Sequence, residues 1–220
     1  MNDFSAARQN MVDGQIHTNG VIDERILSIF SELPREQFVP ERLQSIAYTD
    51  QSLDLGQGRM LIAPAVYARM VQLADLKSDD VVLDIGSSYG YSSAVLANLV
   101  TTVIAVEQNK RQLDKAGRLW DTLGLQNIVL IEESLKQGGV EHAPYNAIFI
   151  NGAIPEVPVS LFEQLEPEGR LVAVIQKPGQ KIGNVRLFYK SALGDISSQA
   201  YFDASVPALK AFDVESAFEF

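Results

Sequence analysis

The stretch VVLDIGSSYGYSSAVLANL, residues 81–99, places an acidic residue and two glycines where a buried strand gives way to a helix. Asp84 ends the strand, Gly86 and Gly90 bracket the turn, and Glu107 ends the next apolar segment. Glycine lets the backbone of such a turn come close to a ligand. A carboxylate in the position of Glu107 can accept hydrogen bonds from both hydroxyls of a ribose. This pattern predicts a site for a nucleoside-type ligand, with a purely structural Rossmann-like sheet as the alternative.

The elements that position these residues are expected to alternate along the chain. Near-continuous apolar stretches predict strands, and the longer stretches between them predict helices. In such βαβ units the strands lie parallel and are covered on both faces. The predicted strands cover residues 79–86, 101–107, 127–133, 145–153 and 169–176, and the predicted helices cover 91–100, 109–125 and 157–165.

The two ends of the chain depart from this alternation. Within residues 1–76 the pattern predicts short helices, and one of them starts at Pro64. A loop-rich stretch over residues 48–63 precedes that helix. Toward the C-terminus, residues 184–192 and 197–209 are predicted as two strands with no helix between them. We therefore expect an α/β fold with a Rossmann-like, doubly wound, mainly parallel sheet over residues 77–220. Residues 1–76 would form a helical extension packed on it, and an antiparallel pair of strands would close one sheet edge.

Composition excludes several classes of function. The chain has no cysteine, which rules out disulfides, thiolate metal sites and cysteine nucleophiles, and its two histidines argue against a histidine-built metal site. With a net charge of −10 and no basic cluster, we expect no nucleic-acid partner. No apolar run approaches the ~20 residues of a membrane span, and the first residues lack the apolar core of a signal peptide. The expectation is a cytoplasmic protein, of undetermined oligomeric state, that binds neither nucleic acid nor membrane nor metal.

The charge at the turn distinguishes between nucleoside ligands. A dinucleotide such as NAD presents a diphosphate, which favours a turn with three glycines and a free helix N-terminus. Here Ser88 stands at the middle position, and Asp84 adds a negative charge that repels a diphosphate. The same charge suits a ligand with an ammonium or a sulfonium group. S-adenosylmethionine carries both, so it is the cofactor that we expect.

Longer motifs connect the chain to a known family. They occur in order as MVDGQIHTNGVIDERILSIFSELPREQFVPERLQSIAYTD, LDLGQGRMLIAP, VVLDIGSSYGYSSAVLA and YNAIFINGAIPEVPVSLFEQLEPEGRLV, of which PREQFVP and APYNAIFINGAIPEVP are especially specific. Over roughly residues 8–175 the chain resembles the protein-L-isoaspartate O-methyltransferases. The resemblance implies a Rossmann-like fold with N-terminal helices and S-adenosylmethionine as cofactor. The implied substrate is the isoaspartyl carboxylate of a damaged protein or peptide.

The resemblance also assigns residues and shows departures. The predicted cofactor-binding residues are Asp84, Gly86, Ser87, Ser88, Gly90, Tyr91, Glu107, Gln108, Glu133 and Ser134. Glu132, Glu133 and Ser134 stand where the family has glycine–aspartate–glycine, and Ser88 stands where it has glycine. Ile62 stands where the family has the serine held to act in the active site. We therefore predict a divergent member that lacks this serine, and we assign no catalytic residue.

The acceptor side of the site is expected to involve Arg59, Met60, Leu61, Ile62 and Asn151. A carboxylate acceptor is already ionised at pH 7, so methyl transfer needs alignment of the reacting atoms rather than a base. Ile62 cannot donate a hydrogen bond to that carboxylate. Arg59 is a substitute cation, with a solvated loop arginine as the alternative. Met60, Leu61 and Ile62 would line an apolar acceptor pocket, or simply pack the loop onto the sheet.

Three functions therefore stay open. The overall resemblance favours an isoaspartyl-repair methyltransferase with atypical substrate contacts. The apolar residues 60–62 favour a methyltransferase with another acceptor. The departures at Ile62, Ser88 and residues 132–134 favour a non-catalytic binding or adaptor protein on a methyltransferase fold.

Overall fold

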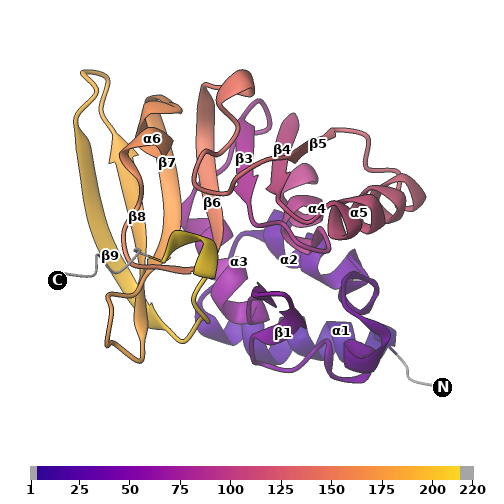
Figure 1. The fold of residues 1–220 in the computed structure, drawn as a ribbon. Helices are drawn as coiled ribbons and strands as arrows, with labels where there is room; N and C mark the ends of the chain where they lie inside the picture. Colours follow the sequence, from indigo (N-terminus) through magenta and orange to yellow (C-terminus); the bar gives the residue numbers. More distant parts are fainter. Residues whose placement is uncertain (1–3, 214–220) are drawn as a thin grey trace, which may run out of the picture.

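The computed structural model describes residues 4–213, which form one large mixed sheet with helices on both faces (Figure 1). The strand order is β5-β4-β3-β6-β7-β8-β9. Pairing is parallel from β5 to β7 and antiparallel for β8 and β9, as the sequence predicts. The strands are β3 (Val81–Ile85), β4 (Thr102–Glu107), β5 (Ile128–Glu132), β6 (Tyr145–Ile154), β7 (Leu165–Ile175), β8 (Gly183–Lys190) and β9 (Ile196–Ala204).

The helices begin at residues that suit helix starts. Asp23 accepts a hydrogen bond from the backbone N–H of Arg25, Asn109 accepts one from Gln112, and Pro64 is the first residue of its helix. The helices are α1 (Phe4–Met11), α2 (Glu24–Glu32), α3 (Pro64–Leu73), α4 (Tyr91–Ala97), α5 (Lys110–Thr122) and α6 (Val159–Glu163). No helix in the described part of the chain is both long and apolar enough to cross a membrane.

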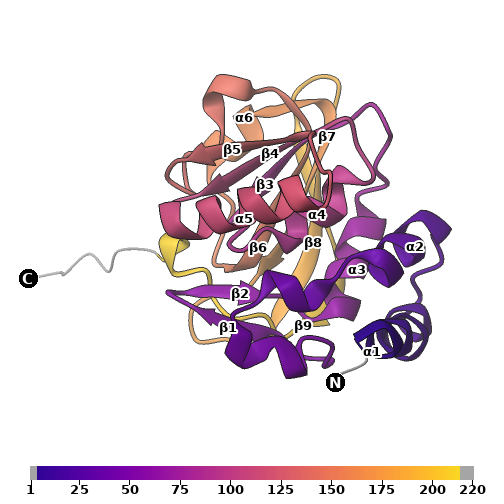
Figure 2. The ribbon, with the colours of Figure 1, turned by 90° about the vertical axis from the view of Figure 1, so that its right-hand side faces the viewer.

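The central strands β3, β4 and β6 are buried almost throughout. One face of the sheet packs against α3, α4, α5 and the N-terminal helices, and the other packs against α6 and the segment after β9. Figure 2 shows α5 lying across the sheet above the short hairpin of β1 (Leu53–Gly56) and β2 (Arg59–Leu61). This hairpin lies inside the stretch that the sequence predicts to be loop-rich.

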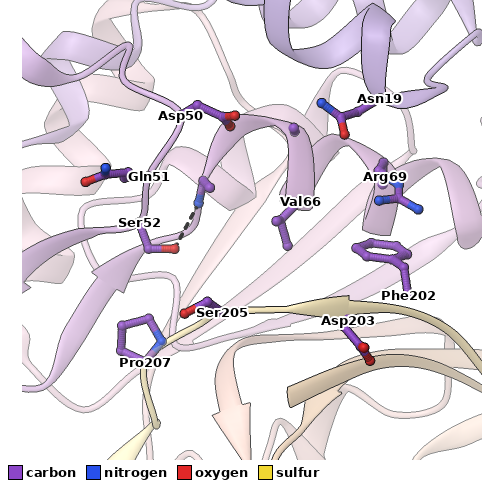
Figure 3. A pocket seen from close by; sticks show the side chains of 12 residues that line it. Asn19, Asp50, Gln51, Ser52, Val66, Arg69, Phe202, Asp203, Ser205 and Pro207 are labelled. Carbon is purple, nitrogen blue, oxygen red and sulfur yellow. Dashed lines mark hydrogen bonds between the residues drawn. The ribbon is translucent and has the colours of Figure 1, made fainter. Parts of the chain in front are cut away.

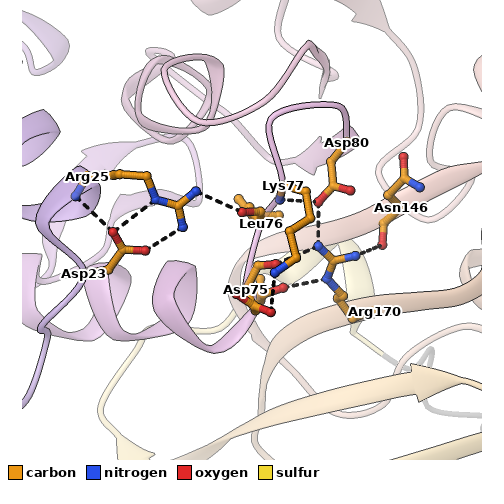
Figure 4. Close-up of polar contacts among 9 residues, drawn as sticks. Asp23, Arg25, Asp75, Leu76, Lys77, Asp80, Asn146 and Arg170 are labelled. Atoms are coloured by element: carbon orange, nitrogen blue, oxygen red, sulfur yellow. Dashed lines mark hydrogen bonds and ion pairs between the residues drawn. The ribbon is translucent and has the colours of Figure 1, made fainter.

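The N-terminal extension packs tightly on the rest of the molecule. The ring of Phe30 on α2 lies 6.1 Å from that of Tyr91 on α4 and 6.4 Å from that of Tyr67 on α3. At the opposite end of the sheet, Arg170 on β7 donates to the carbonyl oxygens of Ala74 and Asp75, which follow α3 (Figure 4). The predicted boundary between residues 76 and 77 stays a prediction, and these contacts join the two sides of it.

The end of the chain differs from the expectation. The strand predicted over residues 197–209 ends at Ala204. Pro207 has no N–H to continue a ladder, and the chain crosses instead to the end of β6, where Ala208 and Ala153 form a single parallel bridge. We call residues 205–212 the C-terminal strap.

Candidate functional site

The turn after β3 has the conformation that brings backbone close to a ligand. Gly86, Ser88 and Gly90 all have positive φ, at 77°, 55° and 86°. For Ser88 this left-handed conformation costs about 1–3 kcal/mol, since it carries a β-carbon. Gly90 has no room for a side chain, because an added β-carbon would lie 2.5 Å from the ring of Trp120. The indole Nε1–H of Trp120, on α5, donates to the Gly90 carbonyl oxygen at 2.9 Å and so holds the turn in place.

Asp84 lies at the end of β3 and is fully buried. Its carboxylate accepts hydrogen bonds from Ser92 Oγ (2.6 Å), Ser93 Oγ (2.5 Å) and Asn151 Nδ2 (2.6 Å). Burial raises the pKa of Asp84, although these three donors oppose the rise and Glu107 adds to it. The structure therefore brings together Asp84, a predicted cofactor-binding residue, and Asn151, a predicted acceptor-side residue. It also adds Ser92 and Ser93, which the sequence reasoning missed; their position in the first turn of α4 was the available signal.

Glu107 ends β4 and is also fully buried, but its carboxylate already has a cation beside it. Arg59 Nε and Nη2 each lie 2.7 Å from one carboxylate oxygen, a bidentate ion pair. The backbone N–H groups of Ser88, Gln108 and Asn109 donate to the same carboxylate at 3.2, 2.7 and 3.0 Å. Arg59 is therefore buried and is not the solvated loop arginine of the alternative. Its contact with an acceptor stays a prediction.

The C-terminal strap lies over the same edge of the sheet. The Ala153 N–H donates to the Pro207 carbonyl oxygen at 3.0 Å, and the Leu209 N–H donates to the Ala153 carbonyl oxygen at 2.8 Å. The Leu209 side chain is 2% exposed and lies 3.5 Å from where a β-carbon on Gly86 would be. Leu135, which follows the β5 end, contacts the same place. The glycine turn is therefore covered by the chain itself.

The predicted acceptor residues Met60, Leu61, Ile62 and Asn151 do share one cavity, with Gly86 as part of its wall. The cavity is small, with a volume of about 20 Å³. Ile62 is 3% exposed, and its carbonyl oxygen accepts a hydrogen bond from Arg35 Nη2 at 2.7 Å. The residues at the acceptor position are thus closely packed.

The remaining predicted residues lie at different distances from the turn. Ser87 is buried and lines the small cavity. Tyr91 is 2% exposed and faces the N-terminal helices, with its ring 5.4 Å from that of Phe38. Glu133 and Ser134 follow β5, two strands away from β3, and Glu133 is exposed with its own carboxylate accepting from the Ser134 N–H at 3.0 Å. Glu133 lines a separate depression and does not reach the small cavity.

The seven-stranded order with an antiparallel C-terminal pair, a glycine turn after β3 and an acid after β4 is the fold of the class I S-adenosylmethionine-dependent methyltransferases. The model of the family "Protein-L-isoaspartate(D-aspartate) O-methyltransferase" matches residues 6–205. The chain belongs to this family.

Individual relatives agree. The chain is 38% identical over 168 residues to the protein-L-isoaspartate O-methyltransferase of Methanoculleus marisnigri, covering 76% of each chain. It is 37% identical over 172 residues to that of Klebsiella pneumoniae, covering 78% of this chain and 83% of the relative. A solved protein-L-isoaspartate O-methyltransferase superposes with a TM-score of 0.79 at 26% identity, over 91% of this chain and 65% of that one. A Plasmodium falciparum structure in complex with S-adenosyl-L-homocysteine has the same fold, with a TM-score of 0.74 at 20% identity over 93% and 98% of the two chains.

These findings confirm the predicted fold class and the predicted family. At the level of that family they also confirm an S-adenosylmethionine-dependent O-methyltransferase with S-adenosylmethionine as cofactor. The assignment of individual residues stays a prediction, and so does the functional meaning of Ile62.

Proposed function

We propose that this chain transfers a methyl group from S-adenosylmethionine to the carboxylate of isoaspartyl residues in damaged polypeptides. Family membership is the observation that carries the proposal. The buried acids support it, since Asp84 and Glu107 lie at the ends of the adjacent strands β3 and β4, beside a glycine turn. Glu107 would hold the ribose hydroxyls, and Asp84 would face the amino-acid part of the cofactor.

Methyl transfer to a carboxylate does not require a catalytic base on the acceptor side of the site. When bound, S-adenosylmethionine supplies the methyl group, so that a carboxylate oxygen gains an O–C bond as the C–S bond breaks and the sulfonium becomes a neutral sulfide. The acceptor carboxylate is ionised at pH 7 and needs no base. The chain's residues therefore contribute by alignment and by exclusion of water. We infer that Ile62, in place of the family's serine, offers the acceptor a dry wall and no hydrogen bond.

The region between the glycine turn, Glu107 and the C-terminal strap, which we call the crevice, sets a condition on cofactor binding. In the structure the groups that would hold the cofactor have partners from the chain itself: Arg59 on Glu107, and Leu209 over Gly86. Cofactor entry therefore requires both to move, and the apparent affinity is reduced by the fraction of molecules in which they have moved.

The direct test is a calorimetric titration with S-adenosylmethionine and S-adenosylhomocysteine, followed by incubation with an isoaspartyl peptide and methyl-labelled cofactor. Binding and an alkali-labile methyl ester are the expected results. Absence of ester with every acceptor tried, in spite of cofactor binding, contradicts the proposed reaction.

A disulfide lock tests the closed crevice. Ala153 and Ala208 are bridge partners, and the chain has no other cysteine, so the double variant A153C/A208C has one pair to oxidise. The oxidised form is expected to lose cofactor binding and the reduced form to bind like the unmodified chain. Equal binding by both forms contradicts the need for the strap to move.

A second function has its own support. The same closure by Arg59 and Leu209 favours a non-catalytic binding protein on a methyltransferase fold. If neither the unmodified chain nor reduced A153C/A208C binds S-adenosylmethionine or S-adenosylhomocysteine, this alternative is favoured over the methyltransferase.

A further inference from the structure

A cavity of about 490 Å³ lies beside α3 and is not used by the residues discussed so far (Figure 3). Its walls come from Ala63 and α3 with Arg69, from the adjoining end of β9 and C-terminal strap with Phe202 and Pro207, and from Asn19 near the N-terminus. Asp50 completes the rim. The cavity is lined by both polar and apolar side chains, and it is far larger than the small cavity at Ile62.

Arg69 is the distinctive group in this cavity. Its guanidinium carbon lies 3.4 Å from the ring centroid of Phe202, so one face of the planar cation is stacked on the ring. Stacking leaves the N–H groups at the edge of the guanidinium available to a ligand. Among residues 4–213, no carboxylate lies within 4.0 Å of it, although Asp50 and Asp203 line the same cavity.

The electrostatics agree with this geometry. Burial lowers the pKa of Arg69, and no neighbouring acid offsets that effect. Asp203 is engaged elsewhere, because its carboxylate accepts a hydrogen bond from Asn184 Nδ2 at 2.9 Å, and Figure 3 shows it pointing away from Arg69. A carboxylate ligand would stabilise this half-buried cation, which otherwise has no counter-charge, and the guanidinium can bind it with two parallel hydrogen bonds.

The position of the cavity relates it to the proposed acceptor site. Ala63 lines this cavity and its neighbour Ile62 lines the small cavity at Gly86. From Pro64 to Arg69 the helix rises roughly 7.5 Å, at 1.5 Å per residue. An extended polypeptide advances about 3.3 Å per residue. The two residues from Ile62 to Pro64, which precede the helix, add at most about 7 Å. A group held by Arg69 is therefore two to four residues along an extended polypeptide from one placed at Ile62.

We propose that this cavity binds an acidic side chain of the acceptor polypeptide, two to four residues from the methylated residue, through the Arg69 guanidinium. The inference rests on the proposed function and specifies its substrate: isoaspartyl sites with a nearby Glu or Asp are the preferred acceptors.

The test uses matched isoaspartyl peptides that carry Glu or Gln at two, three or four residues from the acceptor. The Glu peptide is expected to have a KM about tenfold lower than the Gln peptide, with similar kcat, as one charge-assisted contact implies. The variant Arg69→Gln raises the KM of the Glu peptide by about the same factor and leaves the Gln peptide unchanged. Arg118→Gln, which removes the same charge from an exposed position on α5, changes neither.

Equal KM values for the two peptides, or an Arg69→Gln variant that raises both equally, overturn the inference while methyl transfer itself persists. If no ester forms from either peptide, the proposed reaction fails, and fluorescence anisotropy of the labelled peptides still tests the cavity. Preference for the Glu peptide that Arg69→Gln abolishes supports the inference in that assay, and equal binding of the two peptides overturns it.

Discussion

The crevice at the glycine turn and the cavity at α3 each contain an arginine, and the two arginines differ in whether they have an ion-pair partner. In the crevice, Arg59 is bound in a bidentate ion pair to Glu107, and both groups are buried. In the cavity, Arg69 stacks on Phe202 and has no ion pair within the described residues. A ligand for the crevice must therefore displace a partner that is already there, whereas a carboxylate in the cavity finds a cation without one. Substitutions in the crevice should consequently affect folding more than substitutions in the cavity.

The largest effect is expected from Glu107→Gln. The change leaves Arg59 as a buried cation with no counter-charge, which costs about 3–5 kcal/mol of unfolding free energy. Urea unfolding measures it. Asp75→Asn is the matched control, since Asp75 pairs with Lys77 at 2.6 Å on the surface, and an exposed pair contributes at most about 1 kcal/mol. Equal losses for the two variants would show that the crevice pair is no more important to folding than a surface pair.

Leu209→Ala should come next. Removing the buried side chain lowers the unfolding free energy by about 2–3 kcal/mol, while it weakens the hold of the strap on Gly86 and so tightens the apparent binding of S-adenosylhomocysteine. Thermal unfolding and calorimetry measure the two effects. Leu193→Ala, at a position 91% exposed, should change neither. Weaker cofactor binding in Leu209→Ala would mean that the side chain helps to hold the ligand.

Ser88→Gly should produce a smaller effect of opposite sign. Ser88 has φ 55°, and its buried hydroxyl has no hydrogen-bond partner in the described structure. Glycine relieves the left-handed strain, and after the entropy cost of glycine the gain is about 0.5–1 kcal/mol. Ser87→Gly is the control, because Ser87 is absent from the positive-φ positions and its replacement should destabilise. A lower unfolding free energy of Ser88→Gly in urea would contradict the proposal that the backbone at Ser88 is strained.

Arg69→Gln should lower the unfolding free energy by only about 0.5–1 kcal/mol, through the lost contact with Phe202, an effect as small as that of Ser88→Gly and opposite in sign. Thermal unfolding of this variant completes the comparison between the two regions. A loss as large as that of Glu107→Gln would mean that Arg69 is a structural residue and that the cavity is not arranged for a ligand.

Much of the fold could be predicted because its signals are local. The apolar stretches predicted the parallel strands around β3, and the predicted antiparallel pair is β8 and β9. The acids Asp84 and Glu107 were predicted at the correct ends of their strands. These features depend on neighbours in the sequence, so the chain's pattern was sufficient.

The partners of those acids could not be predicted in the same way. Arg59 is far from Glu107 in the sequence, and Leu209 reaches Gly86 from the other end of the chain. Such contacts depend on how the hairpin and the strap fold back over the sheet, and nothing local to either residue indicates it. The same is true of Arg69 and Phe202, which meet only when α3 and β9 are packed.

Trp120 gives the molecule an optical property. It is the only tryptophan in the chain, it is buried, and its indole is hydrogen-bonded to the Gly90 carbonyl oxygen. Any rearrangement of the glycine turn changes the surroundings of that one fluorophore. Its emission can therefore be followed in real time in stopped-flow mixing, without attaching a dye.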